Sequence, residues 1–277
     1  MSNDDSFNEI VADLSAGRTD EVSSKSIALA EETDDPFTIV KCISLLKVAN
    51  DKETISKLID ILMTKVPEEY NPRVEIAGAL RGLEYPHKAY EILKGMEGED
   101  PLVRIKSICL AEMEEYEMAL SCVTGIKEQT VGDRVLMVDI YSSLGEHSAA
   151  NKIAESLIGE FPKEYVVMRC YVTALILAGR DKEAVKFVRS CLKDKSADSN
   201  AIAAYVMRIT GNIKAAAGYA TRAIQIDNGH VGAMETLGIC LAEKGEIDKA
   251  RIVAGAINEK SPGDKAALNV LSYCDRD

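Results

Sequence analysis

The sequence is poor in the residues from which catalytic and metal sites are usually built. Of its 277 residues none is Trp and 5% are aromatic. Its seven Cys contain no CxxC pair of the zinc or thioredoxin type, and no phosphate-binding glycine loop occurs. We expect the only three His to lie in turns, as solvated residues rather than ligands: His87, His147 and His230. The sequence therefore predicts a protein that is not an enzyme and holds no metal or cofactor.

Long apolar runs are also missing. No run approaches the ~20 residues of a membrane-spanning helix. The chain starts with the acidic stretch MSNDDSFNEI, which does not resemble a secretory signal peptide. The Cys count is odd and the spacing irregular, which favours reduced core thiols over a disulfide framework. We therefore expect a cytoplasmic protein without a membrane segment.

Positive charge is scarce in the first half of the chain. Residues 1–130 hold 14 Lys and Arg against 26 Asp and Glu, whereas residues 131–277 hold 19 of each. A strongly acidic half repels a phosphate backbone, which argues against nucleic acid as the main partner. The simpler interpretation is that the excess of acids keeps the protein soluble. Clusters such as Glu112-Met113-Glu114-Glu115 are interpreted in the same way, as a solvated helix end.

What the sequence does have is a repeated phrase of Gly followed five residues later by Ala. The glycines are Gly145, Gly179, Gly211 and Gly245, separated by 34, 32 and 34 residues. The alanines, Ala150, Ala184, Ala216 and Ala250, keep the same intervals. A period near 34 is typical of a repeat made of two helices. In this pattern the sequence resembles the tetratricopeptide-repeat (TPR) family.

The resemblance implies an all-α fold, an α-solenoid in which helix-turn-helix repeats stack into a right-handed superhelix. We expect one domain over residues 1–277. It would comprise a divergent first repeat at 4–35, about seven TPR-like repeats over 36–264, and a capping helix at 265–277. The repeats begin at residues 4, 36, 70, 100, 131, 165, 197 and 231, and positions are counted from these residues. The phase of the first helix in the repeat at 100–130 stays open by one residue.

Two repeat positions have a physical explanation. Gly at position 15 tolerates the left-handed backbone that joins one helix to the next. Ala at position 20 leaves room for the two helices of a repeat to approach closely. In the last helix, we expect Ala267, Leu268, Leu271 and Cys274 to share the buried face.

In TPR proteins, side chains at positions 2, 5, 9 and 12 of the first helix line a concave groove. The resemblance therefore implies a partner-binding groove lined by Phe37, Val40, Lys47, Asn71, Val74, Arg81, Val135, Asp139, Arg169, Thr173, Ile176, Tyr205, Arg208 and Glu235. The same positions hold Ser44, Gly78, Ser142, Ala201 and Ile239, and Arg104 in the phase chosen for its repeat.

Four cations in this set, Lys47, Arg81, Arg169 and Arg208, outnumber the acids Asp139 and Glu235. Such a lining suits an acidic peptide or a terminal carboxylate, because Arg can donate two hydrogen bonds to one carboxylate. The alternative is that the aliphatic parts of these Lys and Arg side chains cover the apolar surface of the groove, without a role in binding.

Chaperone-binding members of the family hold a carboxylate with Lys at position 5 and Asn at position 9. Here these positions hold Val40 and Ser44 in one repeat, and Arg169 and Thr173 in another. The two-carboxylate clamp is not reproduced, which argues against a chaperone partner.

Two functional hypotheses remain. The first is a non-enzymatic scaffold or adaptor that binds a protein or peptide partner in the groove. The second is a structural subunit of a larger assembly, or a self-associating protein, that docks through its convex face or its ends. Apolar residues exposed in the groove would favour the first, and an exposed apolar first helix the second. The sequence names neither the partner nor the oligomeric state.

Overall fold

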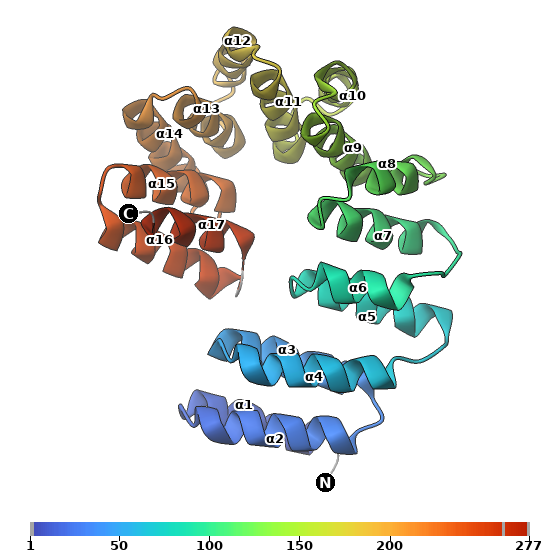
Figure 1. The fold of residues 1–277 in the computed structure, drawn as a ribbon. Coiled ribbons are helices and arrows are strands. Elements are labelled where there is room, and N and C mark those ends of the chain that lie inside the picture. Colours follow the sequence, from blue (N-terminus) through green and yellow to red (C-terminus); the bar gives the residue numbers. More distant parts are fainter. Residues whose placement is uncertain (1–2, 262–263, 276–277) are drawn as a thin grey trace. The chain divides into compact units, whose positions relative to one another are not determined.

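The computed structural model describes residues 3–261 and 264–275, apart from the side chain of Val48. All regular elements in these ranges are α-helices (Figure 1). They are α1 (Asn3–Ser15), α2 (Thr19–Glu32), α3 (Pro36–Ala49), α4 (Lys52–Lys65), α5 (Tyr70–Gly82), α6 (Pro86–Leu93), α7 (Asp100–Glu112), α8 (Tyr116–Thr124), α9 (Val131–Ser143), α10 (His147–Glu160), α11 (Tyr165–Leu177), α12 (Asp181–Cys191), α13 (Ala197–Ile209), α14 (Ile213–Ile226), α15 (Val231–Glu243), α16 (Ile247–Lys260) and α17 (Lys265–Cys274).

The helices are stacked in pairs, as the repeat pattern predicts. Every odd-numbered helix from α3 to α15 begins at the first residue of a predicted repeat, and α17 begins at the first residue of the predicted capping helix. α1 begins one residue early. The start of α7 at Asp100 also answers the question of phase, because it places Arg104 at position 5. No helix in the described ranges is long and apolar enough to cross a membrane.

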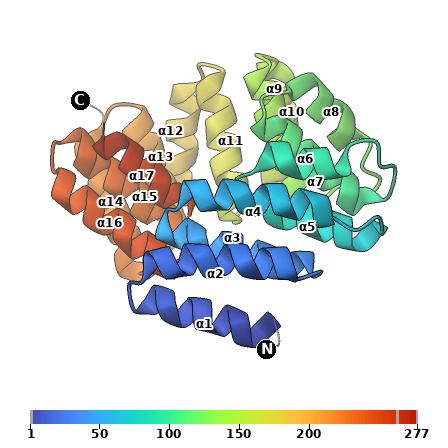
Figure 2. The same cartoon turned by 60° about the horizontal axis from the view of Figure 1, so that its bottom comes forward.

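The chain divides into two compact units, residues 1–128 with α1–α8 and residues 129–277 with α9–α17. Within each unit the odd-numbered helices pack directly against one another, α1 to α7 in the first and α9 to α17 in the second (Figure 2). Each even-numbered helix packs against the odd-numbered helix that precedes it. Each unit is thus a two-layered stack in which equal positions of successive odd-numbered helices are neighbours.

Position 20 is fully buried wherever it is Ala. All of these alanines have 0% exposed surface: Ala89, Ala119, Ala150, Ala184, Ala216 and Ala250. In the divergent first repeat this position is Ser23, whose hydroxyl donates to the Asp51 carboxylate at 2.6 Å instead. The close approach predicted for the helix pairs is therefore present in six repeats, and a hydrogen bond to the next repeat replaces it in the first.

The last helix is buried along the expected side except at Leu268. Ala267, Val270 and Cys274 face the core and Leu271 packs against it, while Leu268 is 42% exposed. Residues 267, 270 and 274 are spaced by three and four, so they share one face, and Leu268 lies off it. Lys265, Asn269 and Ser272 are exposed, and residues 276–277 of the expected capping helix lie outside the described residues.

Position 15 is left-handed in seven successive repeats. Gly145, Gly179, Gly211 and Gly245 have φ between 71° and 85°, as the turn requires. In the first unit the same position is filled by residues other than Gly, at φ between 56° and 68°: Asn50, Glu84 and Glu114. The left-handed conformation costs a residue with a Cβ about 1–2 kcal/mol, less for Asn. The backbone of the first unit is therefore strained at turns that are relaxed in the second.

This difference gives a prediction of opposite sign for two substitutions. Gly179→Ala, where an added Cβ meets nothing within 4 Å, should lower the free energy of unfolding by about 1 kcal/mol through strain alone. Glu114→Gly should raise it by a few tenths of a kcal/mol, because relief of strain exceeds the entropic cost of Gly. Urea unfolding followed by circular dichroism measures both. Equal effects of the two changes would mean that position 15 is not the strained point.

Candidate functional site

The predicted groove residues lie on what we call the odd-helix face, the side chains at positions 2, 5, 9 and 12 of the odd-numbered helices. Some of them form apolar wall rather than exposed contacts. Val74 is 9% exposed and Ala201 and Ile239 are buried, while Phe37, Val40 and Val135 are half-buried against the core. Ser44, Asn71 and Asp139 are exposed, and these remaining residues are half-buried: Lys47, Gly78, Arg81, Arg104, Ser142, Arg169, Thr173, Ile176, Tyr205 and Arg208.

The cations at position 12 are paired with acids of the following repeat. Lys47 Nζ lies 2.6 Å from Glu84 Oε2, and Arg81 Nη1 lies 3.5 Å from Glu112 Oε1. In the second unit Arg208 Nη1 lies 3.4 Å from an oxygen of Glu243. Glu112 and Glu243 both occupy position 13, so the same cross-repeat ion pair occurs in both units.

These pairs correct two expectations from the sequence. The four cations do not form a free basic lining, because Arg169 is also paired, with Glu235 at 3.2 Å. Glu112 is not simply part of a solvated helix end, because it is the partner of Arg81. Neutralised in this way, the cations link neighbouring repeats and exert little attraction on a distant acidic ligand.

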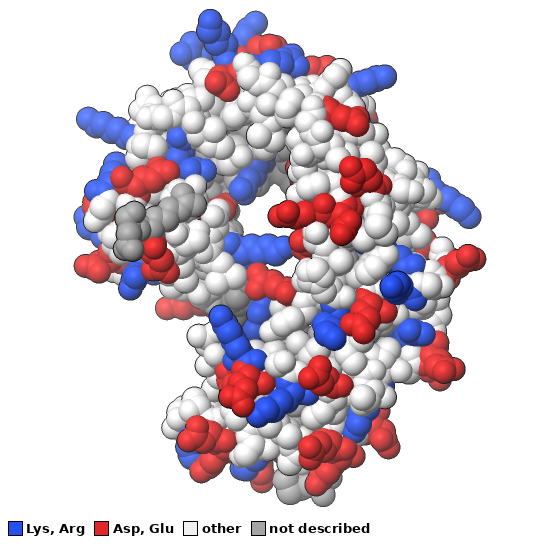
Figure 3. Space-filling model, viewed as in Figure 1, with Lys and Arg blue, Asp and Glu red and all other residues white. Residues whose placement is uncertain are grey.

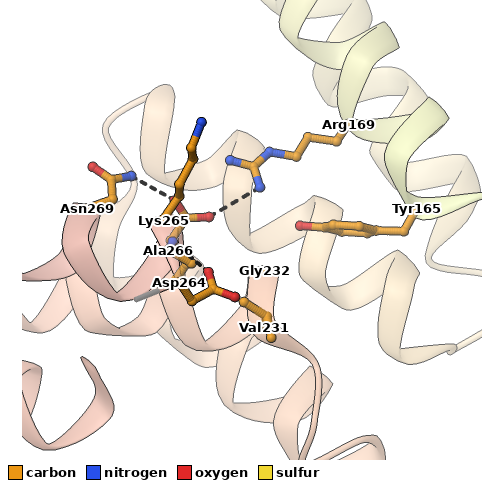
Figure 4. A pocket seen from close by; sticks show the side chains of 9 residues that line it. Tyr165, Arg169, Val231, Gly232, Asp264, Lys265, Ala266 and Asn269 are labelled. Carbon is orange, nitrogen blue, oxygen red and sulfur yellow. Dashed lines mark hydrogen bonds and ion pairs between the residues drawn. The ribbon is translucent and has the colours of Figure 1, made fainter. Parts of the chain in front are cut away.

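In the second unit, position 5 forms a polar chain that crosses three helices (Figure 4). Arg169 of α11 donates to one oxygen of Glu235 on α15, and Asn269 of α17 donates to the other at 2.7 Å. Position 5 of the helix between α11 and α15 is Ala201, which is fully buried. Because Ala201 is short, the Arg169 side chain can extend past α13 to reach Glu235. The carboxylate is only 8% exposed and needs both donors.

The residues at position 9 of α11 and α13 hold the Arg169 side chain in place. The Arg169 guanidinium lies 5.0 Å from the centre of the Tyr205 ring, a cation–π contact. The Tyr205 hydroxyl is 3.0 Å from the Thr173 hydroxyl, in a hydrogen bond in which either group can be the donor. Three of the predicted groove residues are therefore brought together here and hold one guanidinium in place.

A pocket of about 580 Å³ opens beside this chain. Its walls come from the first turns of α11, α15 and α17, and Figure 4 shows Tyr165, Lys265 and Asp264 around it together with Arg169. The Tyr165 hydroxyl is buried and has no hydrogen-bond partner in the described part of the chain. Burial raises the pKa of this phenol to about 12, so it stays protonated and available as a donor.

Gly232 allows Tyr165 to occupy this place. A Cβ at Gly232 would collide with the Tyr165 hydroxyl, so only Gly lets the ring lie against the first turn of α15. The ring edge also contacts His230, with centroids 4.7 Å apart and planes at 87°.

His230, expected to be a solvated turn residue, is instead 9% exposed. Its Nδ1 accepts a hydrogen bond from the Ala233 amide and so caps α15. Because Nδ1 is an acceptor, Nε2 carries the proton and donates to Asp198 at 3.0 Å. The role of His230 is to begin a helix, and within the described ranges no group of three or more His, Cys, Asp and Glu could hold a metal ion.

The thiols that were interpreted as packing residues are buried. Cys109 and Cys240 are fully buried, and burial raises the pKa of both to about 11. A thiol that is not ionised at neutral pH is a poor nucleophile. Both occupy position 10, on the side of the helix that faces the core.

Comparisons with known proteins agree with this architecture. Residues 209–272 match the model of the tetratricopeptide repeat. Among solved structures, a tetratricopeptide repeat protein from Parabacteroides merdae is similar over 86% of this chain and 98% of its own, at 11% identity and a TM-score of 0.54. Yeast Tom70 is similar over 92% of this chain and 59% of its own, at 10% identity and a TM-score of 0.52. No curated protein matches the sequence. Residues 209–272 thus carry the tetratricopeptide-repeat pattern, and the solved structures show that the chain has the same stacked-helix fold.

Sequence reasoning missed several residues of the pocket. Asn269 would have been found by extending position 5 into the last helix, which was treated only as a cap. Tyr165 and Lys265 occupy position 1, which is not among the groove positions, and Gly232 occupies position 2 but has no side chain to mark a contact. The glutamates at position 13, Glu112 and Glu243, would have been found by looking for an acidic residue about one repeat length after each cation at position 12.

The ion pairs yield a prediction about stability. Arg208 and Glu243 have side chains 15% and 27% exposed, whereas the pair Lys249–Glu246 within α16 is 69% and 37% exposed. A double-mutant cycle with Ala in urea should give a coupling free energy of about 1 kcal/mol for the first pair. The second pair serves as the control and should give about 0–0.5 kcal/mol. Equal coupling in the two cycles would show that the cross-repeat pair does not link the repeats.

Proposed function

We propose that this protein is a non-enzymatic scaffold or adaptor that binds a protein or peptide partner on the odd-helix face. Proteins of the tetratricopeptide-repeat family generally mediate protein–protein interactions. The observation that carries the proposal is the pocket beside Arg169. It opens on the odd-helix face, and it presents polar groups whose positions are fixed by other side chains.

The pocket suits an extended polypeptide because it offers both donors and acceptors. Arg169 keeps 38% of its side chain exposed and has N–H groups beyond the one bound to Glu235. The Asn269 amide oxygen is an acceptor. Lys265 and Asp264 at the rim carry opposite charges. Because the charges of the lining balance, the pocket recognises a partner by hydrogen bonds and shape, and the acidic-peptide hypothesis gains no support from it.

The ends of the chain support the adaptor over the self-assembling subunit. On α1 the exposed large apolar side chain is Val11, at 37%, and its other exposed residues are small or polar. On α17 the exposed residues are Lys265, Asn269 and Ser272 beside Leu268. A helix side that is mostly polar offers a second copy little apolar surface to bury.

Site-specific photo-crosslinking tests the proposal. A photoreactive amino acid at Asn71 or Asn269, both exposed on the odd-helix face, should capture the same small set of polypeptides in cells of the source. The control position is Lys152 on α10, which is exposed on an even-numbered helix and should not capture them. Capture from Lys152 with none from the two odd-helix positions would contradict the proposal and favour the structural subunit.

A further inference from the structure

We infer that the second unit has another interaction surface, away from the odd-helix face, which binds an acidic segment of a partner protein carrying one apolar side chain. The surface is a groove of about 390 Å³ between the end of α12 and the last two turns of α14. Its lining includes Leu192, Lys195, Asn200, Tyr219, Arg222 and Ile226, and we call it the α12–α14 groove.

Position 30 of this repeat contributes an apolar side chain to the groove. In two other repeats position 30 is Lys, and its ammonium group bonds to carbonyls at or just past the end of the preceding even-numbered helix. Lys65 does so to Ala30, Glu31 and Thr33, and Lys260 to Asn228. In the seventh repeat the position is Ile226, which cannot form such a bond. The end of α12 therefore has no lysine from the next repeat bonded to its carbonyl groups.

The floor of the groove is apolar and only partly covered. Leu192 and Tyr219 pack on one side against the core cluster of α11–α13 and are half-buried. Ile226 is 56% exposed, and together with Leu192 and Tyr219 it makes the apolar surface of the groove contiguous. If a partner placed an apolar side chain between Leu192 and Ile226, that side chain and the two residues would all be removed from water.

The rim is positively charged, and its charges are free. Within the described ranges no acidic side chain lies within ion-pair distance of Lys195 or Arg222, in contrast to the paired cations of the odd-helix face. The Arg222 guanidinium is stacked 4.6 Å from the centre of the Tyr219 ring. Stacking holds the guanidinium plane in place while its edge N–H groups remain able to donate two bonds to one carboxylate.

The surrounding sequence is basic in the same region. Residues 180–222 contain nine Lys and Arg against four Asp and Glu, a net charge of +5 in a chain of net charge −12. Figure 3 shows Lys and Arg side chains gathered over α12. Charge complementarity therefore selects an acidic partner for this surface, and attraction over a Debye length would speed its encounter.

A nucleic acid fits the groove less well than an acidic peptide. Arg222 covers a face of the Tyr219 ring, so that face is not open for a base to stack upon. The apolar floor between Leu192 and Ile226 has no counterpart on a phosphate backbone. A flexible peptide can instead insert one side chain and place its carboxylates at Lys195 and Arg222.

The test is selection from a displayed library of random peptides against the full chain. We expect enriched peptides to contain at least two Asp or Glu next to one Leu, Ile, Met or Phe. A synthetic copy of the strongest one should bind wild type more weakly as salt is added. Its affinity should fall about tenfold or more in Arg222→Glu and in Lys195→Glu, since each replaces a favourable charge by a repulsive one. Ile226→Ser should weaken it without changing its salt dependence.

The matched control is Lys152→Glu, the same charge change at an exposed position of α10, which should leave the affinity within about twofold. Unchanged melting temperatures establish that each variant is folded.

The inference is overturned if selection yields no acidic peptides, or if those selected bind Arg222→Glu as well as wild type. It is also overturned if the groove variants impair binding of a single-stranded oligonucleotide but not of peptide, or abolish a salt-sensitive oligomer seen by light scattering. Peptides that are sensitive to Asn269→Ala but not to Arg222→Glu would belong to the odd-helix face, so the two proposals fail separately.

Discussion

The close approach of two helices at an alanine is the contact on which the rest of the structure depends. Ala184, like its five equivalents at position 20, has no exposed surface, and it lies in a core cluster to which α11, α12 and α13 contribute. Two short helices cannot bury both their apolar sides alone, and the pair must stack on its neighbours. Stacking in turn places equal repeat positions side by side. The polar chain from Arg169 through Glu235 to Asn269 is a direct result, because all three residues occupy position 5.

The same geometry explains why the two proposed surfaces differ in charge. On the odd-helix face, a cation at position 12 comes within reach of an acid at position 13 of the next repeat, and the pair is neutral. At the end of α14, Ile226 stands where two other repeats have a lysine that bonds to the preceding repeat. Arg222 contacts the Tyr219 ring, and no described acidic side chain lies within ion-pair distance of it. One surface therefore offers fixed hydrogen-bonding groups with balanced charge. The other offers free cations around an apolar floor.

Much of the fold could be predicted from the sequence because the information is local and repeated. Gly145 and its equivalents mark the turns, and Ala150 and its equivalents mark the helix contacts, so the helix pairs and their boundaries follow. The turns at Glu84 and Glu114 carry no glycine, and their left-handed conformation is visible only through the period. The division of the stack after Glu128 leaves no mark in the repeat pattern at all.

The candidate sites were harder to predict because they depend on partners in other repeats. The repeat positions place the cations of the odd-helix face on one side of their helices, but their charges could not be assessed without Glu84, Glu112 and Glu243. The Tyr165 pocket depends on a missing side chain at Gly232, and the α12–α14 groove on a missing lysine at Ile226. Absences of this kind are seen only when one repeat is compared with the others in three dimensions.

The most direct test of the account is the melting temperature of Ala184→Leu against that of Ala178→Ser. Ala184 is fully buried at the helix contact, and three added carbons should overpack it and cost roughly 1–3 kcal/mol. Ala178 follows α11 at the turn and is half-exposed, so a hydroxyl there should change little. The account predicts a clear fall in melting temperature for Ala184→Leu alone. Equal melting temperatures for the two variants would contradict it, because the contact at position 20 would then not determine how the repeats pack.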